Sequence, residues 1–380
     1  MKQILPGATI GIFGSGQLGR MFAIEARKMG YRVHTFSPDK DTPTGQVANI
    51  ETTADYLDSA SIREFAKSVD VITFEFENVP VEAIEIASKY ADVHPKAEIL
   101  YTTQNRLREK TFLRRNAFPH ADFFHIKTLE DLNTATEKIG FPCVLKTAGF
   151  GYDGKGQTKI HSPAEIEKAF QNLKGQEGIL EAFIDFQKEI SVVCARDQKG
   201  NFSHYGVIEN KHKDHILDTS FAPSPISERI KSEAIEIARS IAEIFDYVGT
   251  LCVEFFLTKN EKVIVNEIAP RPHNSGHLTF DACVTSQFEQ QLRAVCGLNL
   301  GSTEMYKPAA MANLLGDLWR DGEPDWPKAL QHPNLKLHIY GKTEARPRRK
   351  MGHLTALADS PEVALKTVVQ ARRNLSQEKL

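Results

Sequence analysis

Hydrophobic residues switch between strand and helix spacing through the first hundred residues of the chain. Ala8–Phe13 is a short apolar run typical of a buried strand, and Gln17–Met29 carries apolar residues at helical spacing. Arg32–Phe36 and Val71–Phe76 predict further strands, and Pro80–Tyr90 predicts a second helix. Strands that alternate with helices predict a parallel sheet covered on both faces, so we expect an α/β region here. The apolar face of the first helix is formed by Leu18, Met21, Phe22, Ala26 and Met29.

The spacing changes after about Arg106, where short strands follow one another in pairs with turn residues between them. Val144–Thr147 is followed by Gln157–Ile160, and Leu251–Leu257 is followed by Lys262–Ile268. Pairs of this kind are typical of antiparallel α+β structure. The middle of the chain is therefore expected to differ in fold class from its beginning.

The last eighty residues, from about Gly301, form a third region. Leu335–Tyr340 and His353–Leu357 are strand-like and enclose a basic loop. Three domains follow from these changes of pattern, as expected for a chain of 380 residues. We place them at residues 1–104, at 105–300 with a subdomain at about 120–185, and at 301–380.

Composition excludes several classes of function. The chain is 41% hydrophobic and 25% charged with a net charge of −2, which argues against a general nucleic-acid binder. No stretch approaches the roughly 20 apolar residues of a membrane span, and the first residues show no signal-peptide pattern. The five cysteines are scattered and form no Cys-x-x-Cys pair. We therefore expect a cytoplasmic protein that binds neither membrane nor nucleic acid.

The first glycine-rich loop, Gly14–Gly19, lies between the first strand and the first helix. Glycines allow the backbone to approach a phosphate, and a helix N-terminus offers free N–H groups to it. A nicotinamide site would usually carry an acid at the end of the second strand, but Ser37 stands there and Asp39 follows a proline. The loop alone leaves three functions open: a nicotinamide site, another phosphate site, or a tight turn that only allows close packing.

A second glycine-rich loop, Gly149–Gln157, contains four glycines in nine residues. It is not a Walker loop, because Gly156 replaces the magnesium-binding Ser or Thr and because it joins two strands. We predict a mobile hairpin loop that closes over a polyphosphate. Lys146, in the apolar strand before it, needs an anionic partner, which a nucleotide phosphate would supply. A flexible hairpin with a snorkelling lysine is the alternative.

Two glutamates become neighbours if the late strand pair forms a hairpin that turns at Asn260 and Glu261. Side chains directly opposite each other on adjacent strands lie about 5 Å apart at their Cβ atoms. A pair of carboxylates at this distance forms a candidate cation site. The opposed pairs that this register predicts are Glu254 with Glu267, Leu257 with Ile264, and Lys259 with Lys262.

The residues around this carboxylate pair are apolar, so two like charges there are destabilising unless a cation lies between them. Oxygen ligands without His or Cys indicate magnesium, which usually arrives with phosphates, and Asn266 could add a third oxygen. Harmless surface acids are the alternative. His273 and His277 lie in a loop rich in Pro and Gly, which disfavours helical zinc-site geometry.

Together, the glycine hairpin, the buried lysine and the paired acids resemble the ATP-grasp superfamily. Within it, Gly151–Gln157 and Asn266–His277 resemble signatures of the 5-(carboxyamino)imidazole ribonucleotide synthase family. The resemblance implies an ATP-grasp fold, with a Rossmann-like first domain, a lid subdomain and a small C-terminal domain that closes the active site. The sequence departs from the family pattern in two places. Ser15 stands where many relatives have Gly, and Ala148 and Gly149 replace bulkier residues. Further matches are Thr73–Asn78, Thr285–Glu289, Asn313–Gly316 and Arg349–His353.

This resemblance implies an ATP-dependent ligase that forms a carbon–nitrogen bond in purine biosynthesis. ATP would activate bicarbonate as carboxyphosphate, and the exocyclic amine of 5-aminoimidazole ribonucleotide would then be carboxylated. The products would be the carbamate, ADP and phosphate. It further implies magnesium and a homodimer. Carboxyphosphate is hydrolysed quickly in water, so a closing glycine loop would have a clear purpose.

The site residues that the resemblance implies fall into four groups. ATP would be held by Arg106, Lys146, Gly151, Tyr152, Asp153, Gly154, Lys155, Gly156, Gln157, Glu181, Ala182, Phe183, Ile184, Glu189, His212, Asn266 and Glu267. Magnesium would be held by Glu254 and Glu267. The ribonucleotide would contact Gly16, Gln17, Leu18, Glu75, Tyr152, Arg271, Lys342, Arg349 and Lys350. The catalytic residues would be Asp153, Arg271 and Lys342.

Three other functions remain open from the sequence. A formate-using or biotin-carboxylating ATP-grasp enzyme would share the carboxylate hairpin. A nicotinamide-dependent oxidoreductase would use the first glycine loop but leave Glu254 and Glu267 unexplained. A nucleotide-sensing scaffold would bind ATP without turnover.

Overall fold

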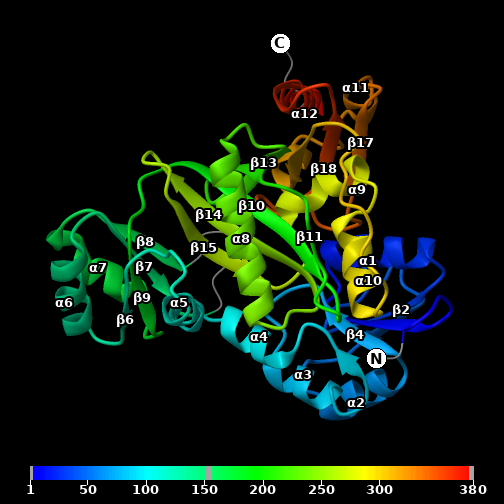
Figure 1. Cartoon of the computed structure of the whole chain (residues 1–380), viewed down its shortest axis with the longest axis horizontal. Coiled ribbons are helices and arrows are strands. Elements are labelled where there is room, and N and C mark those ends of the chain that lie inside the picture. Colours follow the sequence, from blue (N-terminus) through cyan, green and yellow to red (C-terminus); the bar gives the residue numbers. More distant parts are fainter. Residues whose placement is uncertain (1–2, 150–155, 376–380) are drawn as a thin grey trace.

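The computed structural model describes residues 3–149 and 156–375 and contains three sheets. In Figure 1, a small antiparallel sheet projects to the left, a long antiparallel sheet crosses the centre, and a parallel sheet lies at the lower right. The predicted change from α/β to antiparallel structure along the chain is confirmed.

The first sheet is parallel, with strand order β3-β2-β1-β4-β5. The order reverses between β1 and β4, and crevices at such switch points, at the carboxyl ends of the strands, are the usual binding positions in open α/β sheets. Strands β1 and β4 both end at this point, beside the cavity described below. The strands are β1 (Thr9–Phe13), β2 (Arg32–Ser37), β3 (Ile50–Thr53), β4 (Val71–Phe74) and β5 (Asp92–Val93), and the helices α1 (Gln17–Lys28), α2 (Ser59–Lys67), α3 (Val81–Ala87) and α4 (Ala97–Thr103).

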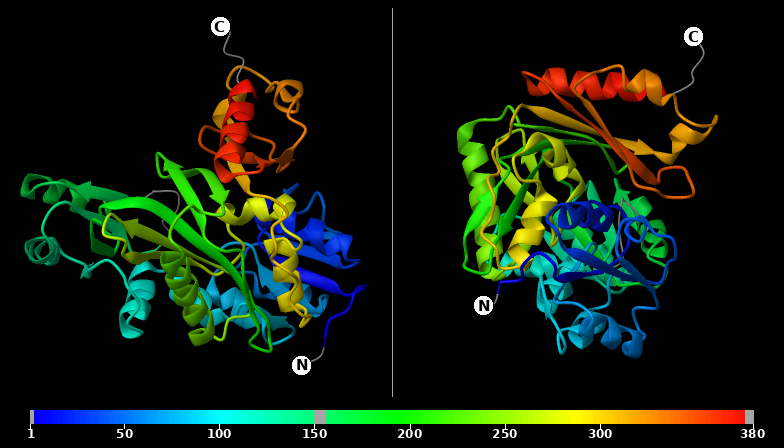
Figure 2. Two further views of the ribbon diagram at one scale, coloured as in Figure 1. Left: turned by 45° about the horizontal axis from the view of Figure 1, so that its top comes forward. Right: turned by 90° about the vertical axis from the view of Figure 1, so that its right-hand side faces the viewer.

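The projecting sheet is antiparallel in the order β6-β9-β7-β8 and carries two helices on one side (Figures 1 and 2). Its β7–β8 pair is the hairpin predicted around the second glycine loop, with Lys146 opposite Gln157. The elements are β6 (Phe123–Ile126), β7 (Cys143–Thr147), β8 (Gln157–Ile160), β9 (Gly178–Ala182), α6 (Leu129–Ile139) and α7 (Ile166–Gln171).

The large sheet runs β15-β14-β10-β12-β13-β16-β18-β17, with β11 paired to β10. The C-terminal strands β16 to β18 thus extend the same sheet, and α12 covers them (Figure 2). The strands are β10 (Phe186–Arg196), β11 (Phe202–His204), β12 (Ile208–Lys213), β13 (Ile216–Ala222), β14 (Gly249–Thr258), β15 (Val263–Ala269), β16 (Ala309–Leu315), β17 (Leu335–Ile339) and β18 (Lys350–Leu357). The remaining helices are α5 (Arg106–Arg115), α8 (Glu228–Ile244), α9 (Thr279–Ala282), α10 (Gln287–Val295), α11 (Trp326–Ala329) and α12 (Pro361–Leu375), with single 3₁₀ turns at Pro163–Glu165, Asn274–Leu278 and Gly316–Trp319.

Helix α1 joins the first region to the rest of the molecule. Its apolar face packs against α10, so that Phe22 shares one buried cluster with Phe288 and Leu292. Burial of such side chains contributes about 1.5–3 kcal/mol each. The parallel sheet is therefore fixed firmly against the large sheet, and residues from both can form one site.

The β14–β15 hairpin confirms the predicted pair of Glu254 with Glu267, but the register between that pair and the turn is wrong by one residue. Phe256, rather than Leu257, lies opposite Ile264. The predicted pair of Lys259 with Lys262 is likewise wrong, because the main-chain N–H of Thr258 donates to the carbonyl of Lys262 at 3.0 Å.

A turn residue and a bulge explain this difference. Glu261 adopts a left-handed conformation with φ of 57°, and its N–H donates to the carbonyl of Thr258 at 2.9 Å. A turn followed by a left-handed residue shifts the pairing by one position. Asn266 then stands in β15 without an opposed residue, as a bulge, and this extra residue restores the Glu254–Glu267 pair.

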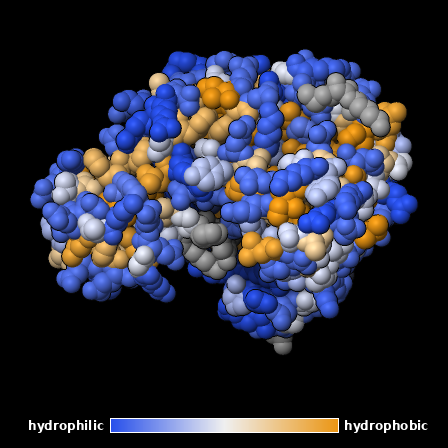
Figure 3. All heavy atoms as spheres, turned by 90° about the horizontal axis from the view of Figure 1, so that it is seen from below, coloured by the Kyte–Doolittle hydropathy of each residue, from blue (hydrophilic) through white to orange (hydrophobic). Residues whose placement is uncertain are grey.

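The surface seen from below is mostly hydrophilic, with apolar residues in small scattered groups (Figure 3). Within the described ranges, no helix is both long enough and apolar enough to cross a membrane. All five cysteines are buried as free thiols, as expected from their scattered spacing.

Candidate active site

A cavity of about 980 Å³ lies where the three sheets meet. It collects residues from the carboxyl end of the parallel sheet, from the projecting sheet and from the β14–β15 hairpin. The predicted site residues that line it are Gln17, Leu18, Glu75, Arg106, Lys146, Gln157, Glu181, Ala182, Phe183, Ile184, Glu189, His212, Glu254, Asn266, Glu267, Arg271 and Lys350.

Some predicted site residues are placed elsewhere. Gly16, Gly156, Lys342 and Arg349 are described but are not among the residues that line the cavity. Gly151, Tyr152, Asp153, Gly154 and Lys155 lie outside the described residues, and so does the greater part of the predicted lid loop.

The projecting sheet contributes a buried ion pair. Nζ of Lys146 lies 2.9 Å from Oε2 of Glu181, and these side chains are only 15% and 6% exposed. Burial alone would raise the pKa of Glu181, but the charges of Lys146, Lys110 and Arg106 lower it to about 2. Oε1 of Glu181 is buried without a hydrogen-bond partner among the described residues. Lys146 therefore already has an anionic partner, whereas Glu181, which lines the cavity, has one oxygen without a partner among the described residues.

Helix α5 begins at the base of the second glycine loop. Asn105 caps the helix, and the main-chain N–H of Arg106 donates to the carbonyl of Ala148 at 2.7 Å. The Arg106 guanidinium donates to the carbonyl of Thr147 at 3.0 Å. The guanidinium of Arg106 at this corner of the cavity is thus held by β7, the strand that precedes the loop.

A second polar pair spans β10 and β12. Nδ1 of His212 lies 2.8 Å from Oε2 of Glu189. Burial would lower the pKa of His212, but the hydrogen bond to Glu189 and the charge of Glu254 raise it above its ordinary value. Both residues line the cavity beside Phe186 and Phe256, whose rings stack with their centroids 4.6 Å apart.

The carboxylate pair is the strongest candidate for a metal site. Glu254 and Glu267 lie opposite each other on β14 and β15, and the bulged Asn266 lines the same cavity. Burial and the charge of Glu267 raise the pKa of Glu254. Nε2 of His273 lies 3.2 Å from Oε1 of Glu254, and burial lowers the pKa of His273, which keeps this ring neutral. The excess negative charge and the oxygen donors fit a hard divalent cation such as magnesium.

Arg271 follows β15 and reaches the loop after β4. Its guanidinium forms a bidentate pair with Glu77, with Nη2 donating to Oε1 at 2.8 Å. Burial would raise the pKa of Glu77, but Arg271 lowers it below its ordinary value. Arg271 is thus held in place by a residue of the parallel-sheet region. That residue, Glu77, was not singled out by the sequence analysis.

The N-terminus of α1 is occupied by a side chain of the protein itself. Glu75 accepts hydrogen bonds from the main-chain N–H groups of Gly16 and of Gly19, the latter at 2.8 Å. These are two of the groups that the first glycine loop was expected to offer to a phosphate. Burial raises the pKa of Glu75. The loop therefore holds Glu75 at the cavity wall, and Gln17 and Leu18 face the cavity beside it.

Lys350 brings the basic C-terminal loop to the cavity. The carbonyl of Lys350 accepts a hydrogen bond from Nζ of Lys342 at 2.7 Å, and the Arg349 guanidinium donates to the carbonyl of Glu344 at 2.9 Å. Lys350 lines the cavity, and the charge of Lys342 acts on Glu75 at the cavity wall, whereas Arg349 helps to fold the loop.

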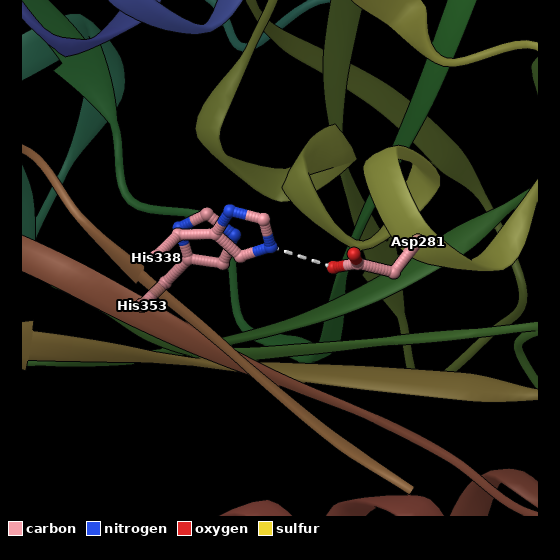
Figure 4. Close-up of side chains that lie close together, drawn as sticks. All are labelled: Asp281, His338 and His353. Atoms are coloured by element: carbon pink, nitrogen blue, oxygen red, sulfur yellow. Dashed lines mark hydrogen bonds and ion pairs between the residues drawn. The ribbon is translucent and has the colours of Figure 1, made fainter. Parts of the chain in front are cut away.

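A second group of possible metal ligands, Asp281, His338 and His353, lies away from this cavity (Figure 4). Nε2 of His338 pairs with Oδ2 of Asp281 at 2.8 Å. The rings of His338 and His353 stack, with centroids 4.5 Å apart and planes at 9°. Because a ring nitrogen binds a metal in its own plane, stacked rings cannot both bind one ion in these orientations. This group fits a metal less well than the carboxylate pair.

Comparison with known proteins agrees with this architecture. Three family models match in succession: a ribonucleotide synthetase preATP-grasp domain over residues 7–104, an ATP-grasp domain over 111–288, and a phosphoribosylaminoimidazole carboxylase C-terminal domain over 309–367. An N5-carboxyaminoimidazole ribonucleotide synthase of Bacillus subtilis is 45% identical over 355 residues, which cover 93% of each chain.

Solved structures are similar over nearly the whole chain. An ADP complex of an N5-carboxyaminoimidazole ribonucleotide synthetase matches with a TM-score of 0.93 and 41% identity, covering 98% of each chain. The Aspergillus clavatus N5-carboxyaminoimidazole synthase in complex with ADP and 5-aminoimidazole ribonucleotide matches with a TM-score of 0.88 and 30% identity, covering 96% of this chain and 98% of that one. The chain therefore belongs to the N5-carboxyaminoimidazole ribonucleotide synthase family of the ATP-grasp superfamily.

Proposed function

We propose that this cavity carboxylates 5-aminoimidazole ribonucleotide with bicarbonate at the expense of ATP, and that Glu254 and Glu267 hold the magnesium ion of the reaction. The overall activity is that of the family: the chain is an ATP-dependent carbon–nitrogen ligase of purine biosynthesis that acts on the aminoimidazole ribonucleotide. The assignments of residues and of the metal are the proposal.

The observation that carries the metal assignment is the cross-strand pair of carboxylates with a bulged amide beside it. Burial and then the charge of Glu267 raise the pKa of Glu254, so a bound cation would lower the repulsion between the two carboxylates. Magnesium bound there would neutralise charge on the nucleotide phosphates. Asn266, which lines the same cavity, would supply a neutral oxygen.

The nucleotide would lie between the projecting sheet and the hairpin. Glu181 to Ile184 would meet the adenine, where the unpaired Oε1 of Glu181 can accept a hydrogen bond from a ligand. The Glu189–His212 pair would meet the ribose. Lys146 and Arg106 would hold phosphates, and Lys146 would then exchange Glu181 for a phosphate oxygen.

The ribonucleotide and bicarbonate would lie toward the parallel sheet. Arg271, fixed by Glu77, would bind bicarbonate and stabilise charge that develops as carboxyphosphate forms. Lys350 would bind the 5′-phosphate of the ribonucleotide, and Glu75 and Gln17 would contact its ribose or amine. Asp153 and Lys342 remain our proposal for proton transfer at the amine. Closure of the Gly151–Gln157 loop would exclude water from carboxyphosphate.

We test this function by measuring ADP release with ATP, bicarbonate and the ribonucleotide together, and then with each omitted in turn. Rapid release should require all three substrates. Equal release with formate replacing bicarbonate, or with a biotin carrier replacing the ribonucleotide, would favour a different ATP-grasp reaction. Release without any acceptor would indicate a simple ATPase.

The family resemblance also leads us to propose that the enzyme is a homodimer of the cytoplasm. Sedimentation at several protein concentrations tests the assembly. A single species with the mass of one chain, 42.6 kDa, at micromolar concentration would contradict it.

A further inference from the structure

Two buried, oppositely charged residues of α5 face the strand that carries the candidate metal ligand. Glu109 and Lys110 are 3% and 2% exposed. Neither lines the cavity, and neither was predicted as a site residue. Burial of a charged group is costly unless it is paired and hydrogen-bonded, so the contacts of these two residues need an explanation.

Their partners are main-chain groups of β15 on both sides of Glu267. Oε1 of Glu109 accepts a hydrogen bond from the N–H of Ile268 at 2.7 Å. Nζ of Lys110 donates to the carbonyl of Asn266 at 2.7 Å and to that of Val265 at 3.4 Å. One charged side chain thus binds the backbone directly before Glu267, and the other binds it directly after.

β15 is the edge strand of the large sheet, and among the described residues its outer side is met by backbone only at Val265, whose N–H donates to the carbonyl of Pro119 at 2.8 Å. Edge strands leave main-chain donors and acceptors unpaired. It also contains the bulge at Asn266, where the regular ladder is interrupted. Without outside contacts, this is the part of the hairpin that could most readily change register or orientation.

Glu109 and Lys110 also interact electrostatically with carboxylates that line the cavity. Burial raises the pKa of Glu109, and the charge of Lys110 opposes this while Glu267 and Glu181 add to it. The charge of Lys110 also helps to lower the pKa of Glu181. The ammonium of Lys110 is therefore a positive neighbour of two carboxylates, Glu109 and Glu181.

From these contacts we propose that Glu109 and Lys110 are positioning residues that hold the Asn266 bulge, so that Glu267 stays opposite Glu254 with both carboxylates directed at one divalent cation. This inference rests on the proposed magnesium role of Glu254 and Glu267. The two residues act through the backbone of β15 and contact neither substrate nor metal. They fix a metal ligand from behind, as outer hydrogen-bond partners do in known metal sites.

A purely structural role would be different in its consequences. If α5 only covered a sheet edge, loss of its contacts would lower the stability of the protein but leave metal affinity unchanged once the protein is folded. Metal affinity in folded variants therefore separates the two roles.

The experiment measures Mn²⁺ binding to the full-length chain in the presence of ADP by electron paramagnetic resonance, with thermal unfolding recorded without metal. Lys110→Met removes the ammonium while keeping a chain of similar length. We expect Mn²⁺ to bind about tenfold more weakly or worse, by analogy with outer-shell losses. Arg115→Met, at the exposed end of the same helix, is the matched control and should bind Mn²⁺ as the wild type does. A folded Lys110→Met protein with wild-type affinity overturns the proposal.

Glu109 supplies a second and independent pair of variants. Glu109→Gln keeps an oxygen that can accept from Ile268, so Mn²⁺ affinity should stay near that of the wild type. Glu109→Leu removes the acceptor and should weaken Mn²⁺ binding. This pair decides the question if Lys110→Met does not fold, and equal affinity in both Glu109 variants counts against the proposal.

Failure of the metal assignment itself can be recognised separately. Glu267→Gln should greatly weaken Mn²⁺ binding if Glu267 is a ligand. If it does so while the Lys110 and Glu109 variants bind normally, only the positioning role is wrong. If Glu267→Gln binds Mn²⁺ like the wild type, the proposed metal site fails, and the positioning role fails with it.

Discussion

Two walls of the cavity carry charged side chains, but they balance these charges differently. On the projecting sheet, Lys146 and Glu181 form an ion pair, so the charges of these two side chains balance each other. On the hairpin, Glu254 and Glu267 oppose each other, and the neighbouring His273 is neutral. On our proposal the hairpin wall binds a cation from outside the chain, whereas at the other wall Lys146 binds a phosphate by exchanging its existing partner Glu181.

This difference predicts different phenotypes for the two walls. Loss of a carboxylate at the hairpin should remove a ligand that no neighbour replaces. Loss of Lys146 should change the strength of nucleotide binding, since Arg106 still lies at the same corner. The variants below test this comparison.

The largest effect is expected at the hairpin. Glu267→Gln should lower kcat by more than about a hundredfold, because an amide oxygen neutralises no metal charge. Circular dichroism should show a folded protein. Glu261→Gln, in the exposed turn of the same hairpin, is the control and should keep full activity. Unchanged turnover of Glu267→Gln at ordinary magnesium concentration would remove the assignment.

The basic loop is expected to give the next largest effect. Lys350→Ala should raise the Michaelis constant for the ribonucleotide by about ten- to a hundredfold and leave that for ATP nearly unchanged, since it removes a charge-assisted hydrogen bond. Arg349→Ala should raise the same constant less, because Arg349 does not line the cavity. Steady-state kinetics with each substrate varied in turn measures both. A larger effect at Arg349 would reverse the order proposed for this loop.

A smaller effect is expected at the projecting sheet. Lys146→Met should raise the Michaelis constant for ATP by about tenfold and change that for the ribonucleotide little. The matched variant Lys159→Met removes a cavity-lining cation that contacts the ring of Phe183 instead of Glu181. If both variants gave the same result, the Lys146–Glu181 pair would have no special role in ATP binding.

The smallest effect concerns stability and pH. The pKa of Glu181 is lowered from 4.5 to about 2 in the folded protein, so its ion pairs stabilise the fold above about pH 4.5 and lose this contribution as pH falls toward 2. The difference in Tm between wild type and Lys146→Met should therefore be constant from pH 7 to 5 and shrink below that. A difference that grows in acid would contradict the depressed pKa.

The hairpin illustrates how far sequence reasoning reaches. Alternation of apolar residues and a short turn were enough to bring Glu254 opposite Glu267. The predicted register between this pair and the turn was wrong, because Glu261 takes a left-handed conformation although it is not a glycine. The bulge at Asn266 cancels that shift, and nothing in the local sequence predicts it.

Other parts of the site depend on tertiary contacts. Glu109 and Lys110 are residue types that are common on exposed helices. Only the packing of α5 against an edge strand buries them. Glu75 was predicted from the family resemblance and Glu77 was not singled out, although both follow β4 at the switch point of the sheet. Their partners, the N–H groups of the first glycine loop and Arg271, come from other elements.

The central claim is that the carboxylates of Glu254 and Glu267 share one divalent cation. The most direct test is a crystal structure with ADP and Mn²⁺ in place of magnesium, with the ion located by its anomalous scattering. Our account predicts a peak between the two carboxylates, at about 2.0–2.2 Å from an oxygen of each. A peak beside Asp281, His338 and His353, or a nucleotide bound without any peak between Glu254 and Glu267, would contradict it.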